Sequence, residues 1–354
     1  MARGHSVTVV AHRPHNAGPR ERLGGVEILR ISCFANRYVY TFAAMLWVAL
    51  RRPQADVIHT TTFNAAPAAW LAGRLRRISV VMTVNETWIG KWRSYTCFSV
   101  TKAAVHDLLE RAVFRFKFDA YVAISKATAT HVSVAIPHAR TRLQTIYYGF
   151  DPTPWRAVAA DSTVREALGL AGRFVVFGYG RPGTSKGFEW FVDSIPAIER
   201  AIPRVAFIFV LSDDSQYTRE LAELKRRAYG HALFLPPQAF AKLVRLMKMA
   251  DCVVVPSLAE GFGYTTLEAV AAGVPVVASR TGSIPEVIGG RFLLVEPRDA
   301  VGLAGALSAI ERGEGERGPE RTFRWSDTID AYEAIYRRLR HGEISVAKRA
   351  TQRA

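Results

Sequence analysis

The chain has 354 residues, enough for two domains that each bury a hydrophobic core. Its 49% hydrophobic content excludes a disordered chain, and the longest apolar run, Tyr38 to Leu50, is too short to span a bilayer. The net charge is +16 and uneven, since residues 1–160 hold 21 Lys and Arg against 8 Asp and Glu.

The first half alternates segments typical of strands with segments typical of helices. Short β-branched apolar runs predict strands, and apolar residues three and four apart predict helices. We predict strands or strand-like segments at residues 5–10, 24–31, 57–59, 79–84, 121–124 and 145–148. We predict helices at residues 41–52, 64–75 and 101–117, and a further helix that opens at Ser125. This order indicates an α/β domain with a parallel sheet.

Aromatic and basic residues are interleaved between Trp88 and Phe118. They are Trp88, Lys91, Trp92, Arg93, Tyr95, Phe98, Lys102, Arg111, Phe114, Arg115, Phe116 and Lys117. This mixture suits a surface that meets anionic lipid, although an ordinary amphipathic helix with a solvated basic side gives the same pattern. Nucleic acid is the less favoured partner, because no recognised binding motif accompanies the charge.

Prolines and mixed polar residues between about residues 151 and 172 interrupt the pattern, so we place the domain boundary there. We predict an N-terminal domain of residues 1–155, a C-terminal domain of residues 156–325, a last helix at 326–340 and a polar tail at 341–354. The second domain has predicted strands at 174–178, 205–211, 232–235, 252–255 and 274–278. Its predicted helices are 188–201, 238–249, 264–272 and 299–311.

Two loops of the second domain carry groups of the kind that suit phosphate and sugar ligands. In the first, Gly180 and Arg181 are followed by Lys186 and a helix start, and two cations on a glycine loop suit a diphosphate. An ordinary surface loop would have the same composition. Asp213 and Asp214 resemble half of a metal site, but no third ligand is placed near them, so we predict no metal and no cofactor.

The second loop is a glycine turn between two carboxylates. Glu260 precedes Gly261, Phe262 and Gly263, and Glu268 lies in the helix that begins near Tyr264 and Thr265. A helix start attracts phosphate, glycine lets the backbone approach a ligand, and a carboxylate accepts hydrogen bonds from ribose or sugar hydroxyls. An ordinary β-α-β unit would also have a glycine turn here.

The stretch E-G-F-G-x-x-x-x-E-A, with G-V-P-V-V-A-S and G-S-I-P-E-V-I after it, resembles the signature of the retaining GT-B glycosyltransferases of family 4. The resemblance spans nearly the whole chain. It implies two Rossmann-like domains that face each other across a cleft, with residues 326–340 crossing back to the first domain. It implies catalytic roles for Glu260, Arg181 and Lys186, with Arg181 and Lys186 on the donor diphosphate and Glu268 on the ribose.

The first half departs from the family pattern in two places. The segment G-H-S-V-T-V-V resembles the family's second strand, so a first strand, glycine loop and helix are expected before it. Without a central strand, edges and apolar surface should be exposed, and we expect either a natural start upstream or a remnant protein. Asn85 stands where the family usually has histidine. Asn85 and His59 are our acceptor-side or sugar-side candidates, although a lone histidine such as His59 is more often structural.

These features predict an enzyme that moves a sugar from a UDP- or GDP-linked donor to a lipid or glycan acceptor, with retention of anomeric configuration. The alternatives are a donor-binding but non-catalytic partner, a nucleotide-sugar epimerase of the same fold, or a nucleic-acid-binding protein. Three widely spaced cysteines and an N-terminus without an apolar core favour a cytoplasmic protein. We expect it to lie peripherally on the cytoplasmic face of an anionic membrane, through its basic N-terminal domain.

Overall fold

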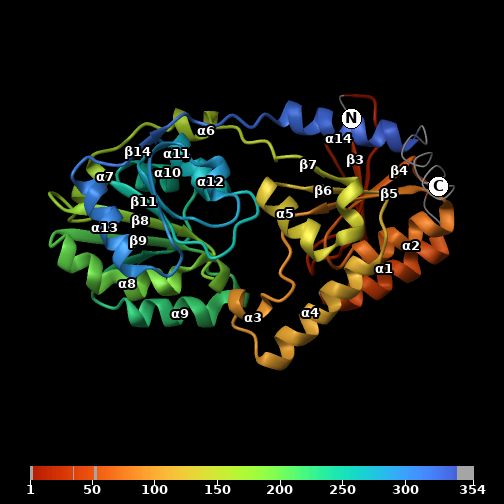
Figure 1. The fold of residues 1–354 in the computed structure, drawn as a ribbon, viewed down its shortest axis with the longest axis horizontal. Coiled ribbons are helices and arrows are strands. Elements are labelled where there is room, and N and C mark those ends of the chain that lie inside the picture. The colour runs from red at the N-terminus through yellow and green to blue at the C-terminus, as the bar shows by residue number, and fades with distance from the viewer. Residues whose placement is uncertain (1–2, 35, 52–53, 341–354) are drawn as a thin grey trace.

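The computed structural model describes residues 3–34, 36–51 and 54–340 and has two α/β halves (Figure 1). The first half contains β1 (Thr8–His12), β2 (Arg20–Leu23), β3 (Val26–Ile31), β4 (Val57–Thr61), β5 (Ser79–Val84), β6 (Ala120–Ala123) and β7 (Leu143–Thr145). Its helices are α1 (Arg37–Arg51), α2 (Ala66–Arg76), α3 (Trp92–Tyr95), α4 (Val100–Arg115) and α5 (Lys126–Ala135). Ser125 accepts a hydrogen bond from the Thr128 N–H and so caps α5, as the sequence predicts.

The second half contains one seven-stranded sheet. Its strands are β8 (Phe174–Gly180), β9 (Val205–Leu211), β10 (Ala232–Leu235), β11 (Cys252–Val255), β12 (Val276–Ser279), β13 (Gly290–Val295) and β14 (Glu316–Gly318). The helices of this part of the chain are α6 (Thr153–Ala157), α7 (Thr163–Ala167), α8 (Phe188–Ala201), α9 (Thr218–Arg227), α10 (Phe240–Lys248), α11 (Tyr264–Ala271), α12 (Ile284–Val287), α13 (Ala300–Glu311) and α14 (Trp325–Arg340). The predicted strands at 79–84, 205–211, 232–235 and 252–255 and the helix at 188–201 are confirmed to the residue.

The seven strands follow the order β10-β9-β8-β11-β12-β13-β14, parallel except for β14. All residues of β9 are buried, because helices cover both faces of the sheet. Phe207 and Phe209 pack on one face, while Ile208 packs on the other with Val175 and Phe177. The hydrophobic core of the second half therefore forms on both faces of this sheet, and it holds the loops at the strand ends in place.

The strands of the first half form two separate sheets. One is β4-β5-β6-β7, all parallel, and the other is β1-β3-β2. β1 and β4 each lie at an edge, and Val9 of β1 and Val7 just before it are exposed. This arrangement agrees with the expectation of exposed strand edges and apolar surface.

Helix α14 crosses from the second half back onto the first. Its Ile335 and Leu339 are buried against Val81, Val122 and Ile146, and Figure 1 shows the helix lying over the strands of the first half. The crossover predicted for residues 326–340 is therefore confirmed.

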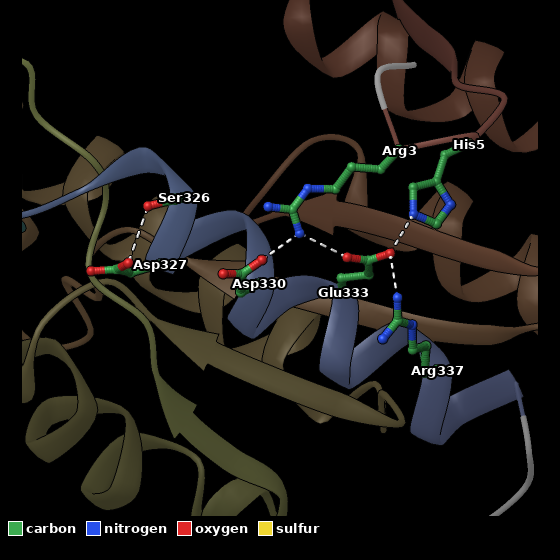
Figure 2. A network of polar contacts seen from close by, with 7 residues as sticks. All are labelled: Arg3, His5, Ser326, Asp327, Asp330, Glu333 and Arg337. Carbon is green, nitrogen blue, oxygen red and sulfur yellow. Dashed lines mark hydrogen bonds and ion pairs between the residues drawn. The ribbon is translucent and has the colours of Figure 1, made fainter.

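A polar network around Glu333 of α14 joins this helix to the chain's first described residues (Figure 2). Glu333 accepts hydrogen bonds from Arg3 at 2.9 Å and Arg337 at 2.9 Å, and lies 3.0 Å from the His5 ring. Arg3 also pairs with Asp330. The hydrogen bonds from Arg3 and His5 lower the pKa of Glu333 to about 2, so its carboxylate stays charged across the physiological range.

A second set of contacts joins the two halves beside the cleft. The Glu286 carboxylate of α12 accepts hydrogen bonds from the N–H groups of Lys126 at 2.9 Å and Ala127 at 2.7 Å. It also accepts one from the Tyr147 hydroxyl at 2.6 Å. A carboxylate of one half thus caps helix α5 of the other, which stabilises the contact between the two halves.

Some sequence predictions were wrong in their bounds. The strand expected at 145–148 is Leu143–Thr145, because Tyr147 and Tyr148 turn into an aromatic cluster with Phe262. The strand expected at 5–10 is Thr8–His12, and the helix expected at 41–52 begins at Arg37. Residue 52 and the predicted tail at 341–354 lie outside the described residues. No helix among the described residues is long and apolar enough to cross a bilayer.

Candidate functional site

The strand order of the second sheet brings the two predicted loops together. β8 lies in the middle, with β9 on one side and β11 on the other. Successive strands after β8 are added on the side of β9, and those from β11 onward on the opposite side, so the strand order reverses between β8 and β11. In open parallel sheets, ligands bind at the carboxyl ends of strands at such a point. β8 ends at Gly180 and β11 ends at Val255, so the loops that carry Arg181, Lys186 and Glu260 start side by side.

Lys186 and Glu260 form an ion pair across these loops. The Lys186 Nζ lies 2.7 Å from the Glu260 Oε2, and both side chains are largely shielded from solvent. The Ser257 hydroxyl donates to the same carboxylate at 3.2 Å. The approach requires a glycine at 187, which has φ +72°; a Cβ there would lie 1.9 Å from the Pro256 carbonyl oxygen.

Glu268 lies behind this pair on α11. Its carboxylate accepts a hydrogen bond from the Tyr179 hydroxyl of β8. Burial raises the pKa of Glu268 and that of Tyr179. The structure therefore brings the two predicted glutamates to the same loop system, one paired with a cation and the other with a neutral donor.

Two cavities open between the halves of the molecule at this point. One has ≈ 390 Å³ of empty space, the other ≈ 360 Å³. The larger is lined by Glu86, Trp88, Arg181, Gly183, Ser185, Lys186, Tyr217 and Ala259. The smaller is lined by Glu86, Thr87, Trp88, Lys91, Tyr95, Ala127, Thr128, His131, Ala259, Glu260, Thr281 and Gly282. The predicted cations thus line one cavity and Glu260 lines the other, with residues of both halves contributing to each.

Glu86 is the residue that the sequence analysis missed. It follows β5 and lines both cavities, and its Oε2 accepts a hydrogen bond from the Trp88 Nε1 at 2.7 Å. Burial and the nearby Glu260 charge raise the pKa of Glu86, and the Lys186 charge opposes them. A carboxylate just after the carboxyl end of a parallel strand was the available signal.

Asn85 and His59, the acceptor-side candidates, are turned away from these cavities. The Asn85 Oδ1 accepts from the Tyr148 hydroxyl at 2.7 Å, and neither residue is among the cavity-lining residues. His59 lies 2.8 Å from the Thr83 hydroxyl and 2.7 Å from the Tyr336 hydroxyl of α14. Desolvation lowers the pKa of His59 to about 4, which keeps it neutral at pH 7.

The remaining donor-side candidates surround the glycine turn. Phe262 is buried in an aromatic cluster, so its backbone is the part available to a ligand. The Tyr264 hydroxyl donates to the Gly149 carbonyl at 3.2 Å, and the Thr265 carbonyl accepts from Tyr179 at 3.5 Å. Gly180, Gly261 and Gly263 lie in the same loop system. These residues shape the site, while Arg181, Lys186, Glu260 and Glu86 present charge to it.

Trp88, Trp92, Tyr95 and Phe98 pack on each other, whereas the aromatic residues at 114, 116 and 118 pack in or against the core of the first half. The ring centroids of Trp88 and Trp92 lie 5.1 Å apart, and those of Phe98 and His106 lie 4.7 Å apart. Glu110, 1% exposed, accepts hydrogen bonds from the Trp88 N–H at 2.9 Å and the Trp92 Nε1 at 2.6 Å. Burial raises the pKa of Glu110 to about 7. These rings therefore support the cleft wall instead of forming a free interfacial surface.

No metal-binding group emerges from the described residues, which hold no set of three or more His, Cys, Asp or Glu side chains placed to share an ion. Asp214 instead accepts a hydrogen bond from Ser212 at 2.7 Å within its own loop.

Comparison with known proteins gives consistent matches for both halves. The profile described as Glycosyl transferase 4-like domain matches residues 1–149, and that described as Glycosyl transferases group 1 matches residues 172–312. A D-inositol 3-phosphate glycosyltransferase of Saccharomonospora viridis is 27% identical, covering 93% of this chain and 79% of that protein. A glycogen synthase of Mycobacterium tuberculosis is 23% identical, covering 97% of this chain and 89% of that protein.

Solved structures show the same fold. Sucrose-phosphate synthase of Thermosynechococcus elongatus aligns with a TM-score of 0.73 at 22% identity, over 96% of this chain and 90% of that chain. Anabaena HepE in complex with UDP-glucose aligns with a TM-score of 0.63 at 22% identity, over 91% of this chain and 86% of that chain. Two successive glycosyl transferase profiles and this fold place the chain in the group 1 glycosyl transferases, with the GT-B architecture.

Proposed function

We propose that the protein transfers a sugar from a UDP- or GDP-linked donor to a lipid or glycan acceptor, with retention of anomeric configuration. The observation that carries the proposal is the Lys186–Glu260 ion pair, at cavities that also contain Arg181 and open between the two halves. The Anabaena HepE structure with UDP-glucose supports a UDP-linked donor. We also propose that the reaction takes place in the cytoplasm, at the cytoplasmic face of a membrane.

The chemistry follows from where charge develops. Breaking the bond between the anomeric carbon and the donor phosphate leaves negative charge on the diphosphate, which Arg181 and Lys186 are placed to stabilise. Lys186 is then shared between the phosphate and Glu260, so an oxygen of the Glu260 carboxylate can accept hydrogen bonds from the sugar hydroxyls. The Tyr179 hydroxyl already donates to one carboxylate oxygen of Glu268, so Glu268 offers its other oxygen to the ribose.

Retention requires the acceptor oxygen to attack from the face that the phosphate leaves. In this proposal a donor phosphate oxygen takes the acceptor proton, so the protein supplies position and charge. Glu86 lies on the opposite wall of both cavities, where it accepts hydrogen bonds from sugar or acceptor hydroxyls.

The test is a panel of nucleotide-sugars, read first as ligand-induced thermal shift and then as nucleotide release with and without acceptors. A shift with one donor and acceptor-dependent nucleotide release would support the proposal. Donor binding without turnover would support the non-catalytic alternative, and isomerised donor without acceptor would support an epimerase.

Lys186→Ala supplies the first specific prediction. At saturating donor the turnover should fall on the order of 10²-fold or more, because the variant lacks a cation at the leaving group. Lys225→Ala, which removes an exposed lysine of α9, is the matched control and should keep the wild-type rate. A normal rate for Lys186→Ala would refute the assigned role.

A further inference from the structure

Helix α1 is apolar on two opposite faces. Tyr40, Ala44 and Val48 are buried on the side that packs in the core with α2. Halfway round the helix, Phe42, Leu46 and Leu50 are 73%, 62% and 72% exposed. Val39 lies on the same face, and no charged residue lies between Arg37 and Arg51. We call Val39, Phe42, Leu46 and Leu50 the α1 stripe. A helix that is apolar all round needs an apolar partner on each side.

The helices of this part of the molecule are rich in basic residues. Together α1, α2 and α4 contain seven Lys and Arg and two acidic residues, Asp107 and Glu110. Asp107 is paired with Arg111, and Glu110 is buried. α4 joins α1 through the Tyr38 hydroxyl, 2.6 Å from the His106 ring, and it exposes Val105, Leu108 and Leu109.

We propose that the α1 stripe is a membrane-docking surface that inserts into the interface of an anionic bilayer. At 15 residues α1 is about 22 Å long, shorter than a bilayer core, so it lies in the plane of the membrane. The apolar side chains enter the headgroup–acyl boundary, and arginines and lysines of α1, α2 and α4 bind anionic headgroups. This surface differs from the aromatic segment at 88–118, whose rings are occupied with each other.

Charge decides between a bilayer and a second copy of the chain. A symmetric dimer through the α1 stripe would bring the same basic helices of two copies together, with almost no acidic residue to receive them. An anionic leaflet provides the opposite charge. The proposal gives a surface to the membrane association proposed above, and it holds or fails independently of sugar transfer, because vesicle binding needs neither donor nor acceptor.

The test compares co-sedimentation with vesicles of phosphatidylcholine alone and vesicles that also contain phosphatidylglycerol. The wild type should sediment with the anionic vesicles at low salt and less at high salt. Phe42→Asp/Leu46→Asp should lower the partition coefficient about tenfold or more, because two inserting side chains become charged. Phe42→Leu should retain binding.

Val301→Asp is the matched control, since Val301 is 80% exposed on α13 in the other half of the molecule. It should bind like the wild type, and circular dichroism melts should show that all variants are folded. Wild-type protein that stays in the supernatant, or a double variant that binds normally, would overturn the proposal. So would a wild-type dimer in sedimentation velocity that the double variant dissociates, with no vesicle binding by either protein.

Discussion

Three glutamates in or beside the cleft have different partners, and the partner determines what each can do. Glu260 pairs with the Lys186 ammonium, Glu268 accepts from the Tyr179 hydroxyl, and Glu86 accepts from the Trp88 indole. Glu260 is therefore tied to Lys186, the cation that we propose binds the donor phosphates. Glu268 and Glu86 are half-buried acids with raised pKa values, which suits binding of neutral hydroxyl groups.

Glu268→Ala should weaken binding of UDP or GDP by about 10- to 100-fold, because hydrogen bonds between a carboxylate and the ribose are lost. Titration calorimetry with the nucleotide alone measures this without an acceptor. Glu223→Ala, on the exposed side of α9, should bind like the wild type. Unchanged affinity in Glu268→Ala would contradict the ribose role.

Glu86→Gln should lower turnover about tenfold or more while donor affinity changes little, since the amide keeps the shape but loses the charge. The raised pKa of Glu86 predicts that wild-type activity falls as pH falls through that pKa, where the carboxylate becomes protonated. This acidic limb of the pH–rate profile should be absent in Glu86→Gln. A variant with an unchanged profile would show that Glu86 is only part of the wall.

At this scale the sequence predicted the charged residues of motifs but not their partners. Lys186 and Glu260 are identified by loop composition and resemblance, and the structure adds that they touch. Glu86 was missed because its neighbour Asn85 occupies the position that the resemblance marks. Which of two successive side chains enters a cleft depends on how the strand end turns, and the hydrogen bond from Tyr148 to Asn85 settles that here.

Among the elements, buried strands were the most predictable. β5, β9 and β11 read as continuous β-branched or apolar runs, as expected for strands covered on both faces. β2, with the sequence R-E-R-L, was missed because all its side chains are exposed and Leu23 is its single apolar residue. β14 was missed for a similar reason, since its pairing with β13 depends on tertiary contacts.

Glu110 of α4 makes the free energy of unfolding depend on pH. Burial raises the pKa of the Glu110 carboxyl from its ordinary value of 4.5 to about 7, so between these pH values the folded protein holds a proton that the unfolded chain has lost. The free energy of unfolding should therefore decrease as pH rises from about 4.5 to 7, by on the order of 3 kcal/mol from this group.

Glu110→Gln should remove that part of the pH dependence, because its amide cannot ionise but can still accept from Trp88 or Trp92. Urea unfolding at several pH values measures the effect. Asp107→Asn, on the same helix, is the comparison variant. If Glu110→Gln and wild type kept parallel profiles, the carboxylate would not be titrating in this range.

At the scale of the whole molecule, the two-domain architecture and the crossover of α14 follow from the resemblance and are confirmed. The contacts that set the distance between the halves do not follow from it. Glu286 reaches the start of α5, and Gly261 meets the backbone of Asn85, because loops from distant parts of the chain fit each other in three dimensions. Sequence patterns report local periodicity and contain no measure of such a fit.

Gly261 lets the two halves approach closely, because it has no side chain at the point where they meet. A Cβ at this position would lie 2.5 Å from the Asn85 carbonyl oxygen and 3.0 Å from the Glu86 Cγ. A single added methyl group would therefore push the two halves apart. Gly261→Ala should shift the protein toward a more open form, seen as a larger radius of gyration in solution scattering. Gly305→Ala, where a Cβ meets nothing within 4 Å, should leave the radius unchanged. The width of the cleft thus depends on the missing side chain at Gly261. In the proposed reaction one half binds the donor and transfer needs both halves, so the alanine variant should keep donor binding and lose transfer.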